Sequence, residues 1–194
     1  MKQQEMLPNI FRHSILVEKI AGFLTRALIK SGRALDLSEV TAAALLHDIT
    51  KTRSIQTHEN HAETGKKLLE ELGYPRIGEI VRCHVEIPTM IVNGLVSSED
   101  IVNYADKRVL HENIVTLGER FQDLIHRYGS STPEACYRLR ILEKQAYQIE
   151  KKIFSGIDFS PEDLSRNSIS YRLTHCPTVS AAFGALKCCL KMRK

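Results

Sequence analysis

Apolar residues recur at intervals of three and four along most of the chain, and no stretch shows the two-residue alternation of a half-buried strand. This spacing places apolar side chains on one face of an α-helix and therefore predicts a bundle of helices. The predicted helices cover about residues 10–30, 36–47, 60–72, 77–84, 97–109, 114–128 and 133–153. Short helices over 160–163 and 179–190 follow a change in character after Gly156. The sequence thus predicts an all-α fold, with a helical bundle over residues 8–155 and a C-terminal appendage over residues 156–194.

Several helix ends carry local signals. Asp36 and Glu39 have the spacing of a capping box and predict the start of the second helix. Gly73, followed closely by Pro75, predicts the end of the helix before it, because glycine readily adopts the left-handed conformation that closes helices. Pro133 predicts the first turn of the last long helix.

Composition narrows the class of protein. Hydrophobic residues make up 43% and charged residues 26%, which is ordinary for a globular domain of 194 residues. The net charge of +4 is spread along the chain without a basic block, so no nucleic-acid partner is expected. The five cysteines are odd in number and lack a C-x-x-C spacing, which indicates reduced thiols. With no apolar run of membrane-spanning length, we expect a cytoplasmic protein without a membrane partner.

Histidines lie at the inner ends of several apolar faces. His13, His47 and His84 each continue a buried stripe on a different predicted helix. One such histidine is usually a packed core residue, but several from separate helices are unusual. Asp48 and Asp106 lie at inward positions beside them, and an unpaired buried carboxylate costs several kcal/mol. Imidazoles and carboxylates facing each other in a helix bundle indicate a site for a divalent metal ion.

Four local phrases carry a family resemblance: AALLHDITK, HAETGKKLLEELGYP, IVRCHVEI and IVNYADKRV. Together, over about residues 9–128, they resemble the HD superfamily of metal-dependent phosphohydrolases. Within that superfamily, the chain is most similar to small bacterial proteins that hydrolyse diadenosine tetraphosphate symmetrically. The likeness fades after Asp106, where DKRVLHENIV departs from the continuation typical of that group.

The resemblance implies two divalent metal ions, with Asp48 bridging them. It implies Fe, Mn, Co, Ni or Mg, because each suits mixed imidazole and carboxylate ligands. The implied ligands are His13, His47, Asp48, His61, His84 and Asp106. Such a pair of ions converts water into hydroxide near neutral pH and holds the phosphoryl oxygens during attack.

Three cations near these ligands are candidate substrate-binding residues. Lys51 lies one turn after His47 and is expected to contact a phosphate or the departing oxygen, and thus to take part in catalysis. Lys107 and Arg108 directly follow the last ligand and are candidates for phosphate contacts. His58 falls outside the matched pattern, whereas His111 is a candidate proton donor or partner of a ligand.

The sequence therefore predicts a hydrolase that cleaves a phosphate ester or phosphoanhydride bond of a nucleotide or a related small phosphorylated substrate by a metal-activated hydroxide. Two other classes stay open. One is a di-iron oxygenase with the same types of ligand, and the other is a non-catalytic HD module that only binds a ligand. The substrate, the native metal and the pairing of subunits into a homodimer are also open at this point.

Overall fold

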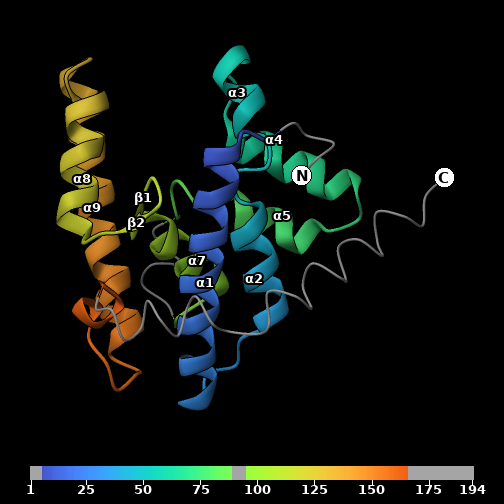
Figure 1. Cartoon of the computed structure of the whole chain (residues 1–194), viewed down its shortest axis with the longest axis vertical. Helices are drawn as coiled ribbons and strands as arrows, with labels where there is room; N and C mark the ends of the chain where they lie inside the picture. Colours follow the sequence, from blue (N-terminus) through green and yellow to red (C-terminus); the bar gives the residue numbers. More distant parts are fainter. Residues whose placement is uncertain (1–5, 89–94, 166–194) are drawn as a thin grey trace.

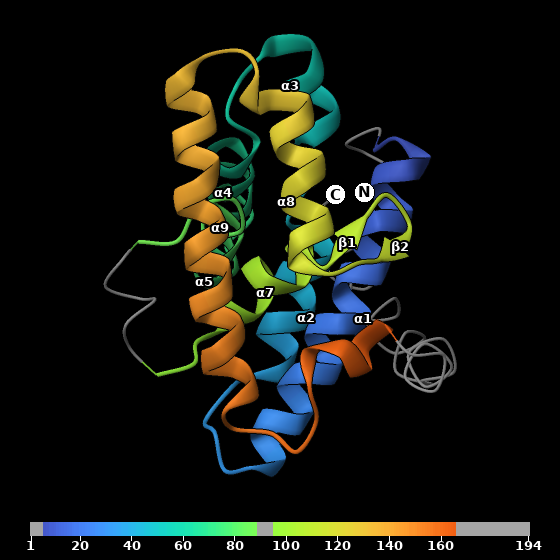
Figure 2. The ribbon, with the colours of Figure 1, turned by 90° about the vertical axis from the view of Figure 1, so that its left-hand side faces the viewer.

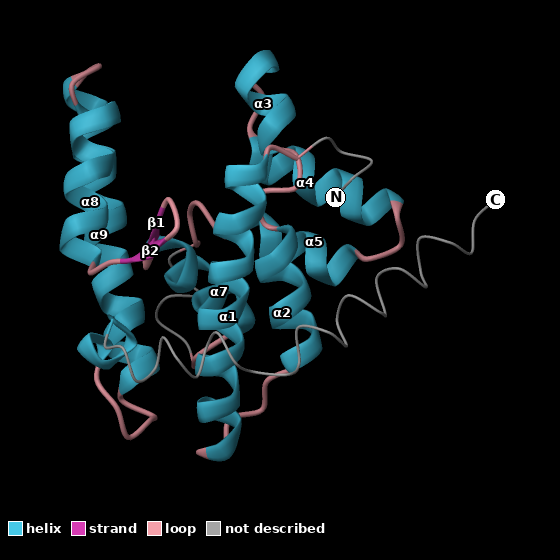
Figure 3. Ribbon diagram, in the orientation of Figure 1, coloured by secondary structure: helices cyan, strands magenta, loops and turns pink. Residues whose placement is uncertain are grey.

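The computed structural model describes residues 6–88 and 95–165 of the chain. Within these residues the fold is built from helices and one hairpin whose two strands have two residues each, which confirms the predicted all-α class (Figure 3). The elements run in the order α1 (Pro8–Lys30), α2 (Leu37–Leu46), α3 (Lys51–Thr57), α4 (His61–Glu71), α5 (Pro75–Arg82), α7 (Ser98–Lys107), β1 (Val109–Leu110), β2 (Asn113–Ile114), α8 (Leu117–Leu124), the π-helical η2 (Ile125–Gly129), α9 (Pro133–Phe154) and the 3₁₀ turn η3 (Pro161–Ser165).

Helix α1 forms the centre of the bundle and packs along α2 and α7 (Figure 1). In the same view, α4 and α5 lie on one side of this centre and α8 and α9 on the other. Figure 2 shows α8 and α9 side by side, with η2 and a short turn joining them. The core is continuous, and the α1 residues Val17, Ile20 and Leu24 are fully buried in it. Burial of each such side chain stabilises the fold by about 1.5–3 kcal/mol.

Helices α4 and α5 pack closely because glycines stand where they cross. A Cβ atom on Gly78 would lie 3.0 Å from the carbonyl oxygen of Lys66, and one on Gly65 would lie 3.1 Å from Cγ1 of Val81. The short connection through Gly73, whose φ is +87°, turns the chain back on itself. The start of α4 and the end of α5 are therefore brought to the same region of the bundle.

The predicted helix signals are confirmed at particular residues. The carboxylate of Asp36 accepts hydrogen bonds from the backbone N–H groups of Ser38 and Glu39 and so caps α2. Gly73 follows α4 in the left-handed region, and Pro133 is the first residue of α9. Ser97 caps α7, as its position before the apolar run predicts.

The structure differs from the prediction between α7 and α8. Ile114 was expected in the stripe of a helix over 114–128, but it lies in β2, paired with Val109 of β1. The helix begins later because Thr116 and Glu119 form a reciprocal capping box there. His111 turns the hairpin with a φ of +56°. Two-residue strands are too short to produce a visible alternation in the sequence.

The chain beyond residue 155 packs onto the bundle as far as it is described. Leu164 is fully buried, and the ring of Phe159 lies 4.9 Å from the ring of Phe23 on α1. The helix predicted over residues 179–190 lies outside the described residues. Among the described helices, none combines the length and the apolar character needed to cross a membrane.

Candidate metal centre

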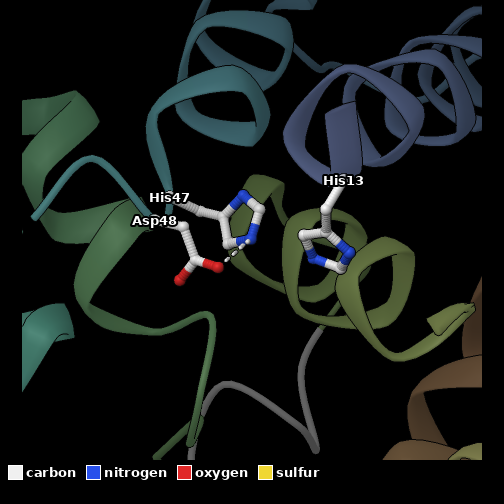
Figure 4. Close-up of side chains that lie close together, drawn as sticks. All are labelled: His13, His47 and Asp48. Atoms are coloured by element: carbon white, nitrogen blue, oxygen red, sulfur yellow. Dashed lines mark ion pairs between the residues drawn. The ribbon is translucent and has the colours of Figure 1, made fainter. Parts of the chain in front are cut away.

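The six predicted metal ligands come together in the structure from five parts of the chain. One lies in the second turn of α1, two in the turn after α2, one at the start of α4, one just past α5 and one in the last turn of α7. In that order they are His13, His47, Asp48, His61, His84 and Asp106. Figure 4 shows His13, His47 and Asp48 pointing toward a common space, with an ion pair between the last two.

The first group of ligands surrounds the imidazole of His47. Its Nε2 lies 3.5 Å from Oδ2 of Asp48 and 3.6 Å from Oδ1 of Asp106. Nε2 of His13 lies 3.0 Å from the same oxygen of Asp106. Candidate ligand atoms of His13, His47 and Asp48 all lie within 4.8 Å of one another, close enough to share one ion.

The second group is built on the other oxygen of Asp48. Oδ1 lies 3.2 Å from Nε2 of His61 and 3.6 Å from Nε2 of His84, and these two nitrogens are 3.1 Å apart. Asp48 therefore belongs to both groups, with one carboxylate oxygen facing each. The tight turn over residues 47–50, which ends α2 and precedes α3, holds this carboxylate between them.

Backbone carbonyls fix the orientation of three of the histidines. In each of them Nδ1 faces a carbonyl oxygen, so Nδ1 carries the proton and Nε2 is left to bind a metal ion. The pairs are His13 with His111 at 3.3 Å, His47 with Ala44 at 2.7 Å and His84 with Val81 at 2.6 Å. His111 thus contacts the predicted ligand His13 through its backbone carbonyl, and this contact does not depend on the imidazole ring of His111.

The buried charges of the site are suited to a cation. His47 is fully buried, and its Nε2 has no hydrogen-bond partner among the described residues. Burial alone would lower the pKa of His47, but Asp48 and Asp106 raise it to about 10. Burial opposes ionisation of both carboxyls, yet the facing histidines hold their pKa values well below the usual range. A metal ion would satisfy the orphaned nitrogen and both carboxylates, so these residues fit the implied ions.

Metal binding is expected to release a proton from His47. A pKa of about 10 means that this imidazole is protonated at neutral pH without metal, whereas burial lowers the pKa of His84 to about 4 and keeps that ligand neutral. Because a ligand must lose its proton, metal affinity should rise about tenfold per pH unit between pH 7 and 9. Calorimetric titration in buffers of different ionisation enthalpy measures the released proton. An affinity that stays constant over this range would contradict the expectation.

Lys51 lies at the edge of the site. Its Nζ is 3.3 Å from Oδ1 of Asp48 and 3.5 Å from Nε2 of His61, and its side chain is 40% exposed. The ammonium group therefore reaches both the second group of ligands and the solvent. His58 lies at the end of α3 in a left-handed conformation and belongs to neither group of ligands.

The predicted role of Lys107 in substrate binding is corrected by its burial. The residue is 5% exposed, and its ammonium group donates hydrogen bonds to the carbonyls of His84 (2.9 Å) and Val85 (3.3 Å). Asn103 donates to the carbonyls of Cys83 and His84 in the same place. Lys107 and Asn103 therefore hold the chain that presents a ligand. Sequence reasoning missed Asn103 because an asparagine within a helix carries no signal for this role.

The predicted contact between Arg108 and a substrate phosphate is corrected in the same way. Arg108 is 1% exposed. Its guanidinium donates hydrogen bonds to the carbonyls of Val115 and Pro161 and to the hydroxyl of Tyr104, and it lies 3.6 Å from the carboxylate of Glu150. These contacts join the end of α7 to the segment just after β2, to α9 and to η3. Arg108 is therefore part of the core and does not face the metal ligands.

Comparison with known proteins assigns the chain to a family. Residues 10–124, more than half of the chain, match the HD domain. The chain belongs to the HD domain family. A ribonuclease Y from Geobacter sulfurreducens is 27% identical to it over 119 residues, which cover 60% of this chain and 22% of that protein. The chain thus spans about a fifth of the length of this curated relative. No solved structure matches. Membership indicates a metal-dependent phosphohydrolase, and the HD domain includes all six predicted ligands.

Proposed function

We propose that this HD domain hydrolyses a phosphate ester or phosphoanhydride bond of a nucleotide or a related small phosphorylated substrate at a dinuclear metal centre. The observation that carries the proposal is the position of Asp48, which turns one oxygen toward each group of histidines. Divalent ions held there would supply a hydroxide nucleophile at neutral pH and would neutralise charge on the phosphoryl oxygens. The finer likeness to diadenosine tetraphosphate hydrolases stays a prediction.

The protein's own residues hold and orient the reacting groups. His13, His47 and Asp106 would hold one ion, while His61 and His84 would hold the second, with Asp48 shared between them. The carbonyl contacts at Nδ1 keep the rings from turning, which preserves the geometry between turnovers. Lys51 reaches the second group from the exposed side, where its charge favours the departing oxygen of the substrate.

Turnover of a substrate panel tests the proposal. The protein is loaded with Mn²⁺, or with Fe²⁺ in the absence of oxygen, and products are separated by chromatography. The panel holds dinucleoside polyphosphates, nucleoside mono-, di- and triphosphates and cyclic nucleotides. We expect hydrolysis of at least one of them, lost when a chelator removes the metal. Confirmed metal binding with no hydrolysis of any phosphate ester would reject the proposal.

A second candidate substrate is the phosphodiester bond of RNA. The observation that favours it is the similarity to a ribonuclease Y, although that protein is much longer than the region that matches this chain. A short single-stranded RNA therefore belongs in the panel. Faster cleavage of the RNA than of every small nucleotide would select this candidate and overturn the expectation that no nucleic acid is bound.

A further inference from the structure

A cavity of about 270 Å³ lies between the start of α4, the segment after α5 and helix α9. It directly adjoins the second group of metal ligands along the chain. Asn60 and Ala62, which line it, are the neighbours of His61, and the lining residue Val85 follows His84. Because neighbouring residues are covalently linked, the cavity lies close to the backbone of both histidines, although their side chains do not line it. The rest of a molecule whose phosphate reaches these histidines therefore has a hollow nearby.

The charges that line the cavity are balanced. Arg82 and Arg138 stand against Glu63 and Glu86, and a guanidinium nitrogen of Arg138 lies 2.5 Å from a carboxylate oxygen of Glu86. Arg82 also pairs with a glutamate outside the cavity. An arginine that is already paired with a carboxylate attracts a further anion only weakly. The cavity is therefore suited to a neutral polar group, and not to a further phosphate.

Two side-chain amides give the cavity directional hydrogen-bonding groups. The carbonyl oxygen of Asn60 accepts from two backbone N–H groups of α4, which leaves its NH₂ group as a donor. The amide of Gln145 makes no side-chain hydrogen bond within the part of the chain that the structure describes, and it offers both a donor and an acceptor. A paired donor and acceptor is the arrangement that reads the edge of a nucleobase.

Apolar side chains complete the cavity. Ala62, Val85, Ile87 and Pro88 line it beside the amides, so a flat ring can lie against them while its edge faces Gln145. The volume lies below the roughly 300–1,000 Å³ typical of sites for whole drug-sized ligands, as expected for a pocket that takes only part of a molecule.

Resting on the proposed function, we propose that this cavity binds the nucleoside portion of the substrate, and that α9 sets base preference through Gln145. This residue lies beyond residues 10–124, which match the HD domain. The family domain thus carries the metal ligands and one wall of the cavity, while α9 forms the opposite wall. Base preference would thus depend on α9 and not on the metal ligands.

Equilibrium binding of adenosine tests the cavity without turnover, because adenosine has no phosphate to bind a metal ion. The full chain loaded with Mg²⁺ is titrated with adenosine and with ribose by calorimetry. Adenosine is expected to bind at least about tenfold more tightly than ribose, and Gln145→Leu to weaken adenosine binding by about tenfold or more. The matched control is Gln148→Leu on the exposed face of the same helix, which should change nothing.

The result distinguishes this proposal from the proposed function. Adenosine binding that is unchanged in Gln145→Leu, or no tighter than ribose binding, overturns the nucleoside site even if phosphate esters are hydrolysed. Adenosine binding that depends on Gln145 supports the site even if the proposed reaction fails. Hydrolysis of p-nitrophenyl phosphate, which lacks a nucleoside, should be the same in Gln145→Leu as in the unaltered protein. Loss of that hydrolysis would assign Gln145 to the reaction itself and also overturn the proposal.

Discussion

Replacing Asp48 with asparagine is expected to remove metal binding from both groups of histidines. We also expect kcat/KM for the best phosphate substrate to fall by at least about 10³-fold, equivalent to about 4 kcal/mol of transition-state stabilisation. Asparagine keeps the size of the side chain but loses the charge that faces His47 on one side and His61 on the other. No other described residue belongs to both groups, so neither group keeps its carboxylate bridge.

The metal content of the Asp48→Asn variant decides the matter. Mass spectrometry of protein loaded with Mn²⁺ and then dialysed counts the ions per chain, and circular dichroism verifies that the bundle is folded. Asp36→Asn is the matched control, because asparagine caps a helix as well as aspartate does and α2 should be undisturbed. A full complement of metal in Asp48→Asn would show that the centre lies elsewhere.

The convergence of the six predicted ligands could be expected from the sequence because their positions follow simple geometry. His13 and His84 each continue an apolar stripe, and a residue on such a stripe faces the core whatever its chemistry. The order and spacing of the six residues then match one family pattern. Helix ends were predictable for a similar reason, since Asp36 and Pro133 act on the turn in which they lie.

The partners of these ligands could not be predicted, since most of them are backbone carbonyls. Any residue supplies a carbonyl, so the acceptors for His13, His47 and His84 leave no mark in the sequence. The residues that line the cavity could not be predicted from the sequence either. Gln145 is one polar residue among many on α9, and only the folded chain brings it opposite the start of α4.

The phosphate contacts predicted for Lys107 and Arg108 do not fit the structure because α7 is enclosed by the rest of the protein. A charged residue at a helix end is usually solvated, and a phosphate contact was the natural alternative. Residues 98–105 of α7 are all buried, so this helix is enclosed on every face and its last turn has little access to solvent. Lys107 and Arg108 must then find their partners inside the protein, among carbonyls and a carboxylate.

Replacing Arg108 with methionine is expected to lower the free energy of unfolding by about 3–5 kcal/mol, the cost typical of removing one partner from a buried ion pair. Methionine fills much of the same volume, so the loss reports the charge and its hydrogen bonds. Glu150 would be left without its cation, and the carbonyls of Val115 and Pro161 without a donor. Urea unfolding followed by circular dichroism measures the change at a metal concentration held constant.

Two comparisons make the Arg108 prediction specific. Arg140→Met, on the surface of α9 and paired only with Glu143 among the described residues, should cost less than about 1 kcal/mol. Adding Glu150→Leu to Arg108→Met should restore part of the stability, because the partly buried carboxylate that has lost its cation is then removed. If Arg108→Met instead raised KM for a phosphate substrate and left unfolding unchanged, the guanidinium would act on the substrate. Because this side chain is enclosed where four elements meet, we expect unfolding to respond first and KM to follow only through loss of folded protein.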